Sequence, residues 1–227
     1  VYPMQLLLNA ASQMEKKPYI TFAGSVTQCG LTKKLLVGES VKDNPSTVYD
    51  SHKLLAENHL KSYIEKNLVN GACLRLSNVY GPGPKSSKND RGILNSMVRK
   101  ALRKETLTVY GSGDYIRDYM FIDDVVIAFL ACPVHAERTN GNHYIVGSGK
   151  GHSVKEAIDT VARVVERITG LIVDVTSVKP PDGCLDIEYR NFVANSSSFK
   201  SDTGWFARTD LEEGIIKTVN SFKASEF

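Results

Sequence analysis

The sequence alternates short apolar runs with helical segments, and this order restricts the chain to a small group of folds. The runs at 18–24 (PYITFAG) and 71–77 (GACLRLS) are short and apolar, which is typical of buried strands that lead into loops. Helical segments are expected at 3–16, from a cap at Ser46 or Thr47 to about 67, at 91–103 and at 123–132. With a further strand at 107–110, the alternation predicts one half of a Rossmann-type doubly wound parallel sheet, an α/β fold.

From about residue 140 the pattern loosens, and a smaller α+β lobe is expected. It combines a strand at 143–146, a helix after the capping residues Ser153 and Glu156, a strand at 171–176 and a final helix that begins near Asp210. We expect a catalytic domain at 1–80 and 115–147, and a substrate-binding lobe at 81–114 and 148–227.

The composition excludes several classes of protein. The 227 residues carry a formal net charge of only +3, and no basic stripe indicates a nucleic-acid partner. The 4 cysteines are too widely spaced for a zinc site or a disulfide framework, so we expect reduced, mostly buried thiols and no metal. No apolar run approaches the length of a membrane span and no signal peptide is evident, so we expect a cytoplasmic protein.

The pair Tyr49 and Lys53 carries the strongest chemical signal. A spacing of four places both side chains on one face of a helix. A phenol normally titrates at about pH 10, and a nearby ammonium favours the phenolate, which makes the pair a proton-transfer group for alcohol oxidation or ketone reduction. Ser25, which ends the strand before this helix, could bind the oxygen of the reacting carbinol. Taken alone, such a pair is better interpreted as part of a solvated helix face, and a serine after a strand is far more often a turn residue.

The order of several motifs makes the resemblance to a known family specific. The chain resembles the extended short-chain dehydrogenases/reductases, and within them the NAD-dependent epimerase/dehydratase group that acts on nucleoside-diphosphate sugars, such as UDP-glucose 4-epimerases. The segments that carry the resemblance are 24–30 (GSVTQCG), 49–53 (YDSHK), 74–83 (LRLSNVYGPG), 110–119 (YGSGDYIRDY), 144–149 (YIVGSG) and 203–214 (TGWFARTDLEEG).

The resemblance implies a role for particular residues. Tyr49 would be the catalytic acid/base, Lys53 would tune it and hold the nicotinamide ribose of NAD or NADP, and Ser25 would bind the substrate hydroxyl. Asn78 and Arg117 match residues beside the diphosphate of the sugar nucleotide, which suits the planar fork of a guanidinium. Thr108 and Tyr110 match positions that border the base, or are ordinary strand residues. Arg75 and Arg99 fit surface or ion-pair roles better than phosphate contacts.

The chain also departs from the family. The family opens with a Gly-x-x-Gly-x-x-Gly loop that receives the dinucleotide, and the chain has no such opening, so we expect a fragment or a piece that needs its complement. The turn at 147–151 (GSGKG) has a different glycine spacing and is interpreted as structural. Gly24 and Cys29 replace a hydroxyl residue and a tyrosine of the family. Val26 and Thr27 stand where dehydratases carry Asp-Glu, which counts against 4,6-dehydration.

Alternative functions remain open at this point. The resemblance favours an epimerase that transiently oxidises a sugar hydroxyl. A 4-keto-sugar reductase of the same family is the nearest rival, and a non-catalytic subunit that has lost cofactor binding is the alternative from another class. A homodimer is implied by the helices 3–16 and 47–66, which match the helices that pair between subunits; otherwise their apolar stripes pack inside one subunit.

Overall fold

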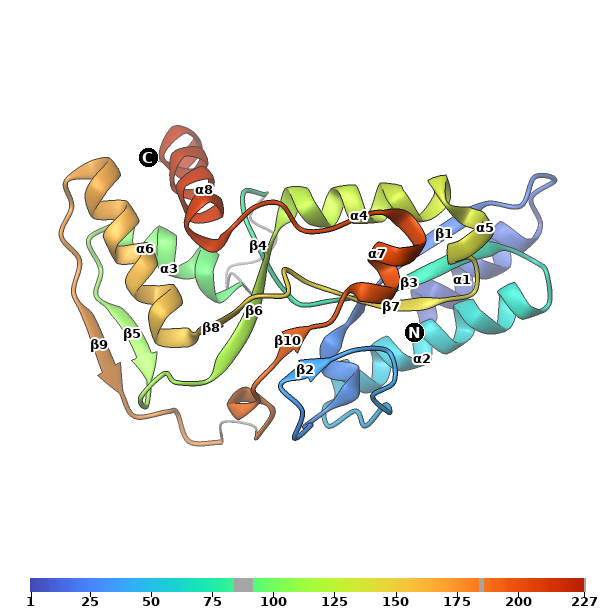
Figure 1. Ribbon diagram of the computed structural model, residues 1–227, viewed down its shortest axis with the longest axis horizontal. Coiled ribbons are helices and arrows are strands. Elements are labelled where there is room, and N and C mark those ends of the chain that lie inside the picture. The colour runs from blue at the N-terminus through green and yellow to red at the C-terminus, as the bar shows by residue number, and fades with distance from the viewer. Residues whose placement is uncertain (84–91, 184–185, 227) are drawn as a thin grey trace.

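The computed structural model describes residues 1–83, 92–183 and 186–226 and has a mixed α/β fold with parallel sheets. The strand β1 (Tyr19–Ser25) pairs with β3 (Asn70–Leu76), and β3 pairs with β7 (His143–Val146), in the order β1-β3-β7 with every pairing parallel. The predicted α/β fold is thus confirmed (Figure 1).

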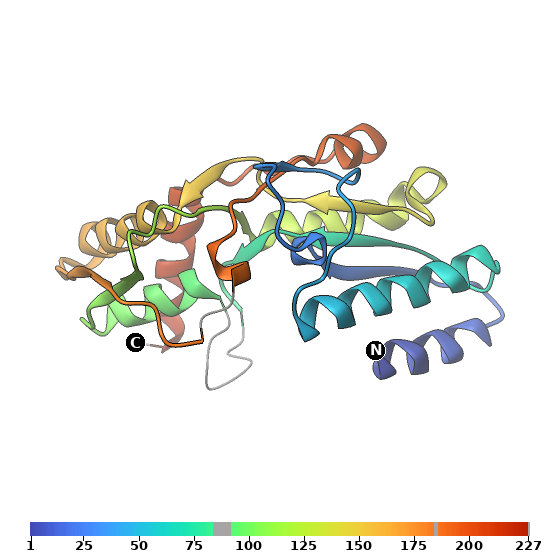
Figure 2. The same cartoon turned by 90° about the horizontal axis from the view of Figure 1, so that it is seen from below.

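Helices cover both faces of this sheet. The helices α1 (Tyr2–Ser12) and α2 (Val48–Glu65) bury apolar side chains against Ile20 and Phe22 of β1. On the other face, α4 (Ile122–Val134) packs against Ala72 and Leu74 of β3 (Figure 2). Because successive strand residues point to opposite faces, Cys73 and Arg75 of β3 lie on the α2 side.

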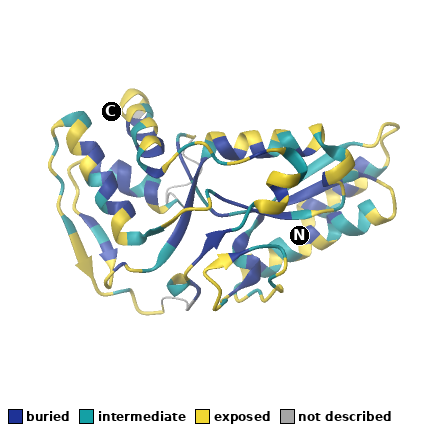
Figure 3. Ribbon diagram, in the orientation of Figure 1, coloured by how far each residue is buried: buried dark blue, intermediate teal, exposed yellow. Residues whose placement is uncertain are grey.

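The remaining elements gather around a second apolar core. Its helices are α3 (Ile93–Leu102), α6 (Val154–Thr169) and α8 (Leu211–Glu226). Its strands include β5 (Leu107–Tyr110), which pairs with β9 (Val175–Val178), and a sheet of β4 (Asn78–Tyr80), β6 (Ile116–Phe121) and β8 (Gly151–Ser153). Figure 3 shows buried residues concentrated where these helices meet the strands. The domain boundaries given above stay a prediction.

Short elements connect the two groups. The strands β2 (Leu36–Val37) and β10 (Val193–Ala194) pair in parallel, and α5 (Ala136–Thr139) and α7 (Ser197–Thr203) flank the first sheet. Two 3-10 turns complete the described chain, η1 (Val26–Cys29) directly after β1 and η2 (Asp186–Tyr189).

Several local predictions need correction. Residues 78–80 were expected in a loop, but they form β4, because β6 offers a parallel partner. The strand β6 itself was not predicted. The strand expected at 171–176 is displaced to Val175–Val178, where it pairs with β5, and Ile172 is exposed. The Ser153 hydroxyl caps α6 as expected, but the Glu156 carboxylate contacts His152 instead of completing the capping box.

The structure bears on two expectations from composition, which concern the cysteines and membrane-spanning helices. Cys29, Cys73 and Cys132 are buried free thiols, as expected, and Cys184 lies outside the described residues. Within residues 1–83, 92–183 and 186–226, no helix has the length and hydropathy needed to cross a membrane.

Candidate active site

The first two turns of α2 carry Tyr49 and Lys53. The Thr47 side chain caps this helix by accepting a hydrogen bond from the backbone of Asp50. The Lys53 Nζ atom donates to the backbone oxygen of Ala23 at 2.7 Å, and it lies 5.7 Å from the centroid of the Tyr49 ring. Lys53 therefore contacts the carboxyl end of β1, and Tyr49, one turn earlier on the helix, is 53% exposed.

Burial changes the charge properties of the Lys53 ammonium. Removal from water lowers the pKa of Lys53, because the charged form loses solvation, and the nearby Cys73 opposes this effect. The Lys53 Nζ atom also lies 5.2 Å from the centroid of the Phe22 ring. A partly desolvated cation beside a phenol stabilises the phenolate more strongly than a solvated one, because the local dielectric is low.

Ser25 ends β1 at the same edge and begins the turn η1. Its side chain accepts a hydrogen bond from the backbone of Thr27, and its own backbone N–H donates to Gln28 Oε1 at 2.8 Å. The Ser25 Oγ and Thr27 Oγ1 atoms are 2.7 Å apart, and the Thr27 hydroxyl donates to a carboxylate oxygen of Asp50. The structure thus brings Ser25, Tyr49 and Lys53 to one end of β1, two of them from the same helix.

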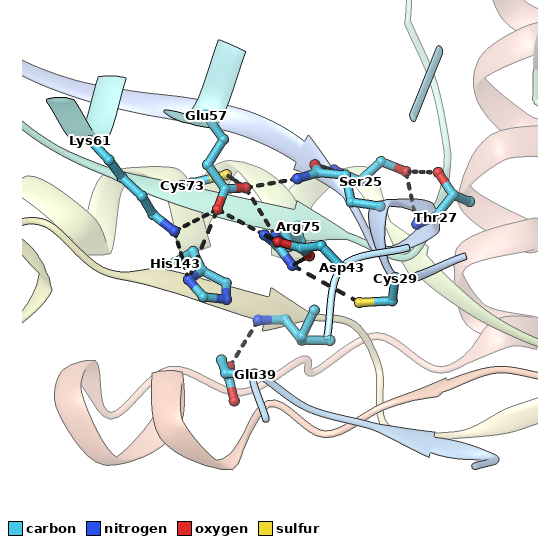
Figure 4. A network of polar contacts seen from close by, with 12 residues as sticks. Ser25, Thr27, Cys29, Glu39, Asp43, Glu57, Lys61, Cys73, Arg75 and His143 are labelled. Carbon is cyan, nitrogen blue, oxygen red and sulfur yellow. Dashed lines mark hydrogen bonds and ion pairs between the residues drawn. The ribbon is translucent and has the colours of Figure 1, made fainter. Parts of the chain in front are cut away.

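A buried ion cluster lies on the same face of the sheet (Figure 4). Arg75 donates from Nε and Nη2 to the Glu57 carboxylate, both at 2.9 Å, and its other bonds go to the Asp43 carboxylate and to Cys29 Sγ. Glu57 also accepts from Lys61 at 2.7 Å and from Gln28 at 2.8 Å. Glu57 is one helical turn beyond Lys53, so this cluster fixes the helix that carries Tyr49 and Lys53 against β3.

The charges in the cluster stabilise one another. Burial by itself would raise the pKa of the Glu57 carboxyl, but the hydrogen bonds and charge of Arg75, together with Lys61 and Gln28, hold it far below its usual value. Burial would likewise lower the pKa of Arg75, and the bonds to Glu57 and Asp43 outweigh that effect and raise it. The ion-pair role expected for Arg75 is confirmed. Arg99 lies over the ring of Phe222, with its Cζ atom 3.9 Å from the centroid.

Gly24 makes room for this cluster. A Cβ atom at Gly24 would lie 2.7 Å from Cys73 Sγ and 3.0 Å from Gln28 Oε1. The departure from the family at this position therefore has a structural reason, because a Cβ atom here would clash with Cys73 Sγ and crowd the amide of Gln28.

The residues expected to bind the sugar nucleotide do not all lie together. Asn78 comes two residues after Leu76, the partner of Ser25 in the parallel register, so it lies at the same sheet edge. Arg117 lies on β6, where Asn78 pairs with Tyr119. Thr108 and Tyr110 lie on β5, in a separate pair with β9.

The Arg117 guanidinium is buried against the segment that contains η2. It donates to the backbone oxygen of Glu188 at 2.6 Å and to that of Arg190. Burial, and then the positive charge of Arg190, lower the pKa of Arg117 to about 10. Within the described side chains, no carboxylate forms an ion pair with Arg117, and its hydrogen bonds go to backbone oxygens.

The turn at 147–151 is structural, as predicted. The Asp118 carboxylate accepts hydrogen bonds from the backbone N–H groups of Ser148 at 2.8 Å and Gly149 at 2.9 Å. Gly149 has φ +73°, a conformation that favours glycine. The backbone donors of this turn are therefore already occupied by a carboxylate of the chain itself.

Sequence reasoning did not single out Gln28, Asp50 or Glu57. A signal for Glu57 was present, because it lies four residues after Lys53 and on the same helix face. Gln28 and Asp50 gave no comparable signal, since their partners come from segments that only the fold brings together.

The sequence of this chain is similar to those of several known proteins. Residues 3–147 match the family model described as the NAD dependent epimerase/dehydratase family. The chain is 30% identical over 187 residues to the UDP-glucose 4-epimerase of Mycolicibacterium smegmatis, an alignment that covers 82% of this chain and 56% of that protein. The chain spans 57%, 49% and 56% of the length of three curated relatives that it matches.

Solved structures share the fold of this chain. The UDP-glucose 4-epimerase of Thermotoga maritima, crystallised with UDP-glucose, has a TM-score of 0.84 at 24% identity, which covers 99% of this chain and 69% of that one and shows the fold. The structure of MoeE5 in complex with UDP-glucuronic acid and NAD has a TM-score of 0.82 at 25% identity, covering 99% and 71%.

Proposed function

This chain belongs to the NAD-dependent epimerase/dehydratase family, and on that basis we propose that it is the catalytic part of a nucleoside-diphosphate-sugar epimerase. The observation that carries the proposal is the meeting of Lys53, Tyr49 and Ser25 at the carboxyl end of β1, with Lys53 bonded to Ala23 O at 2.7 Å. The enzyme would oxidise a sugar hydroxyl transiently and reduce the resulting ketone from the opposite face.

In this proposal Tyr49 is the acid/base. Its phenolate removes the proton of the sugar hydroxyl and returns it when the ketone is reduced, and Lys53 stabilises the phenolate by its charge. Ser25 binds the hydroxyl that reacts. A bound nicotinamide dinucleotide would take up and give back the hydride.

The chain offers suitable groups for that cofactor, NAD or NADP. The Lys53 ammonium is half-buried, and only one of its hydrogen bonds is taken by Ala23. An ammonium has three donors, and Ala23 takes one of them in the described part of the chain, so two are left there for the hydroxyls of a ribose. Tyr49 and Ser25 border the same position.

The proposed substrate is a nucleoside-diphosphate sugar. Arg117 supports this choice, because a buried guanidinium without a carboxylate partner gains from an arriving anion such as a diphosphate. Asn78 would contact the same group, and Thr108 and Tyr110 would border the base. Which sugar, base and carbon react stays open to the assay below, and the cytoplasmic location stays a prediction.

The assay follows UDP-glucose and UDP-galactose interconversion by the full-length protein that contains this chain. We expect Tyr49→Phe to lower kcat by roughly 10²–10⁴-fold, the usual contribution of general acid–base catalysis. Tyr63→Phe is the matched control, because Tyr63 lies on the same helix and donates to Asn9. Activity retained by Tyr49→Phe would disprove the acid/base assignment. Turnover of a 4-keto sugar alone would indicate the reductase, and no turnover of either a non-catalytic subunit.

We also propose a homodimer that forms through α1 and α2. The helix α1 buries Met4, Leu8 and Ala11 against its own subunit, whereas Leu6, Leu7 and Met14 are exposed. An exposed apolar helix face of this kind is a frequent interaction surface. Light scattering after gel filtration should give a dimer for the wild type and a monomer for Leu6→Glu/Leu7→Glu. Ile172→Glu, at a position 77% exposed, is the control, and an unchanged mass of the double variant would exclude this surface.

A further inference from the structure

Ser25 is tied to α2 by two separate routes. The first runs from its backbone N–H to Gln28 Oε1 at 2.8 Å, and then from Gln28 Nε2 to Glu57 Oε2, also at 2.8 Å. The second runs from the Ser25 hydroxyl to Thr27 Oγ1 at 2.7 Å, and from Thr27 to the Asp50 carboxylate. Both routes therefore end on the helix that carries Tyr49 and Lys53.

The first route is rigid because Gln28 is fully enclosed. Gln28 and Glu57 are both 0% exposed, so neither group can exchange its partner for water. The amide of Gln28 uses its oxygen for Ser25 and its nitrogen for Glu57, and this division fixes its orientation. Glu57 in turn is held by Arg75 of β3.

The second route reaches α2 beside the catalytic tyrosine. Asp50 follows Tyr49 directly and is only 2% exposed. The Thr27 hydroxyl donates to the Asp50 carboxylate, and the Thr27 oxygen lies 2.7 Å from Ser25 Oγ, so Thr27 links the serine to the helix. The second carboxylate oxygen of Asp50 is buried without a partner in the described part of the chain, so the bond to Thr27 is the interaction that holds this side chain.

We propose that Gln28 with Glu57, and Thr27 with Asp50, form a two-point clamp that sets the position of Ser25 relative to Tyr49 and Lys53. These four residues are positioning residues that act through Ser25, so the inference rests on the proposed function. Small displacements of a group that binds the reacting oxygen cost much of its effect, because orientation contributes to the barrier. The clamp would supply that orientation from two sides.

The test cuts each route in the full-length protein. Thr27→Val removes the hydroxyl at nearly constant shape, and Gln28→Met removes both hydrogen bonds of the amide. We expect each to lower kcat roughly tenfold or more and to change KM for the UDP-sugar less than about threefold, because binding contacts remain. Thr27→Ser, which keeps the hydroxyl, should restore most of kcat.

A double-mutant cycle separates positioning from general stability. If Thr27 and Gln28 act through Ser25, neither substitution should lower kcat further in a Ser25→Ala background. Equal losses in both backgrounds would overturn the clamp, as would full activity of Thr27→Val and Gln28→Met beside an impaired Ser25→Ala. The proposed function itself requires that Ser25→Ala and Tyr49→Phe lose activity. Failure of the clamp alone would leave those two losses in place, so it can be told apart from failure of the proposed function. If Gln28→Met does not fold, the Thr27 variants decide the test.

Discussion

Two buried arginines, Arg75 on β3 and Arg117 on β6, have opposite electrostatic environments. Arg75 in the β1-β3-β7 sheet is 1% exposed and bonded to the carboxylates of Glu57 and Asp43, and its pKa is raised. Arg117 on β6 is 6% exposed and bonded to backbone oxygens, and burial lowers its pKa to about 10.

The difference indicates what each arginine does. Arg75 is neutralised by the chain itself, and its fork joins a helix, a strand and a loop into one unit. Arg117 keeps a buried positive charge that forms no ion pair with a described carboxylate. This difference supports the diphosphate-binding role proposed above for Arg117 and a structural role for Arg75.

The largest expected effect is on stability at Arg75. Replacing it by Met leaves the Glu57 carboxylate buried without its main partner, which costs about 3–5 kcal/mol in comparable buried pairs. Urea unfolding followed by circular dichroism would measure the loss. A loss below about 1 kcal/mol would mean that the cluster does not hold the sheet to α2.

The pH dependence of stability should show the same cluster. The pKa of Glu57 is depressed in the folded state, so its contribution is complete above the unfolded value and is lost as pH falls below it toward the folded value. Stability should therefore fall below about pH 4.5, and less steeply in Glu57→Gln. Parallel curves of unfolding free energy against pH for the two proteins would contradict this assignment.

Replacing Arg117 should affect substrate binding more than it affects stability. Arg117→Met should weaken UDP-glucose binding by roughly 10–100-fold, since a hydrogen bond to a charged group contributes about 1.5–3 kcal/mol. The stability of Arg117→Met should fall less than that of Arg75→Met, because removing Arg117 leaves no carboxylate buried without its ion-pair partner among the described residues. Calorimetric titration of the full-length protein measures the affinity, and an unchanged Kd would remove Arg117 from the site.

The smallest effect is expected at an exposed ion pair. Lys155 Nζ lies 2.6 Å from Asp159, and the Lys155 side chain is 51% exposed. Lys155→Gln should cost at most about 0.5 kcal/mol, because solvent screens the pair. In the same urea experiment, a loss of unfolding free energy as large as that of Arg75→Met would show that burial does not explain the different contributions of the two ion pairs to stability.

Residue spacing and helix capping made the elements around Ser25, Tyr49 and Lys53 predictable from the sequence. The helix with Tyr49 and Lys53 has a capping threonine at its start, and the strand before Ser25 is a short apolar run, so both were placed from the sequence. The strand at Asn78–Tyr80 was not, because its partner β6 follows some forty residues later. The partners of Arg117 are backbone oxygens of the segment around η2, which no sequence pattern reveals.

The sequence by itself determined the α/β order, the family and the candidate trio of Ser25, Tyr49 and Lys53, since these depend on spacing and on motif order along the chain. Only the tertiary structure decided that Glu57 neutralises Arg75, that Arg117 has no ion pair with a carboxylate among the described residues, and that Gln28 contacts Ser25 while Asp50 contacts Thr27. The physical reason is that spacing fixes neighbours within one element, whereas partners across elements depend on how strands and helices pack.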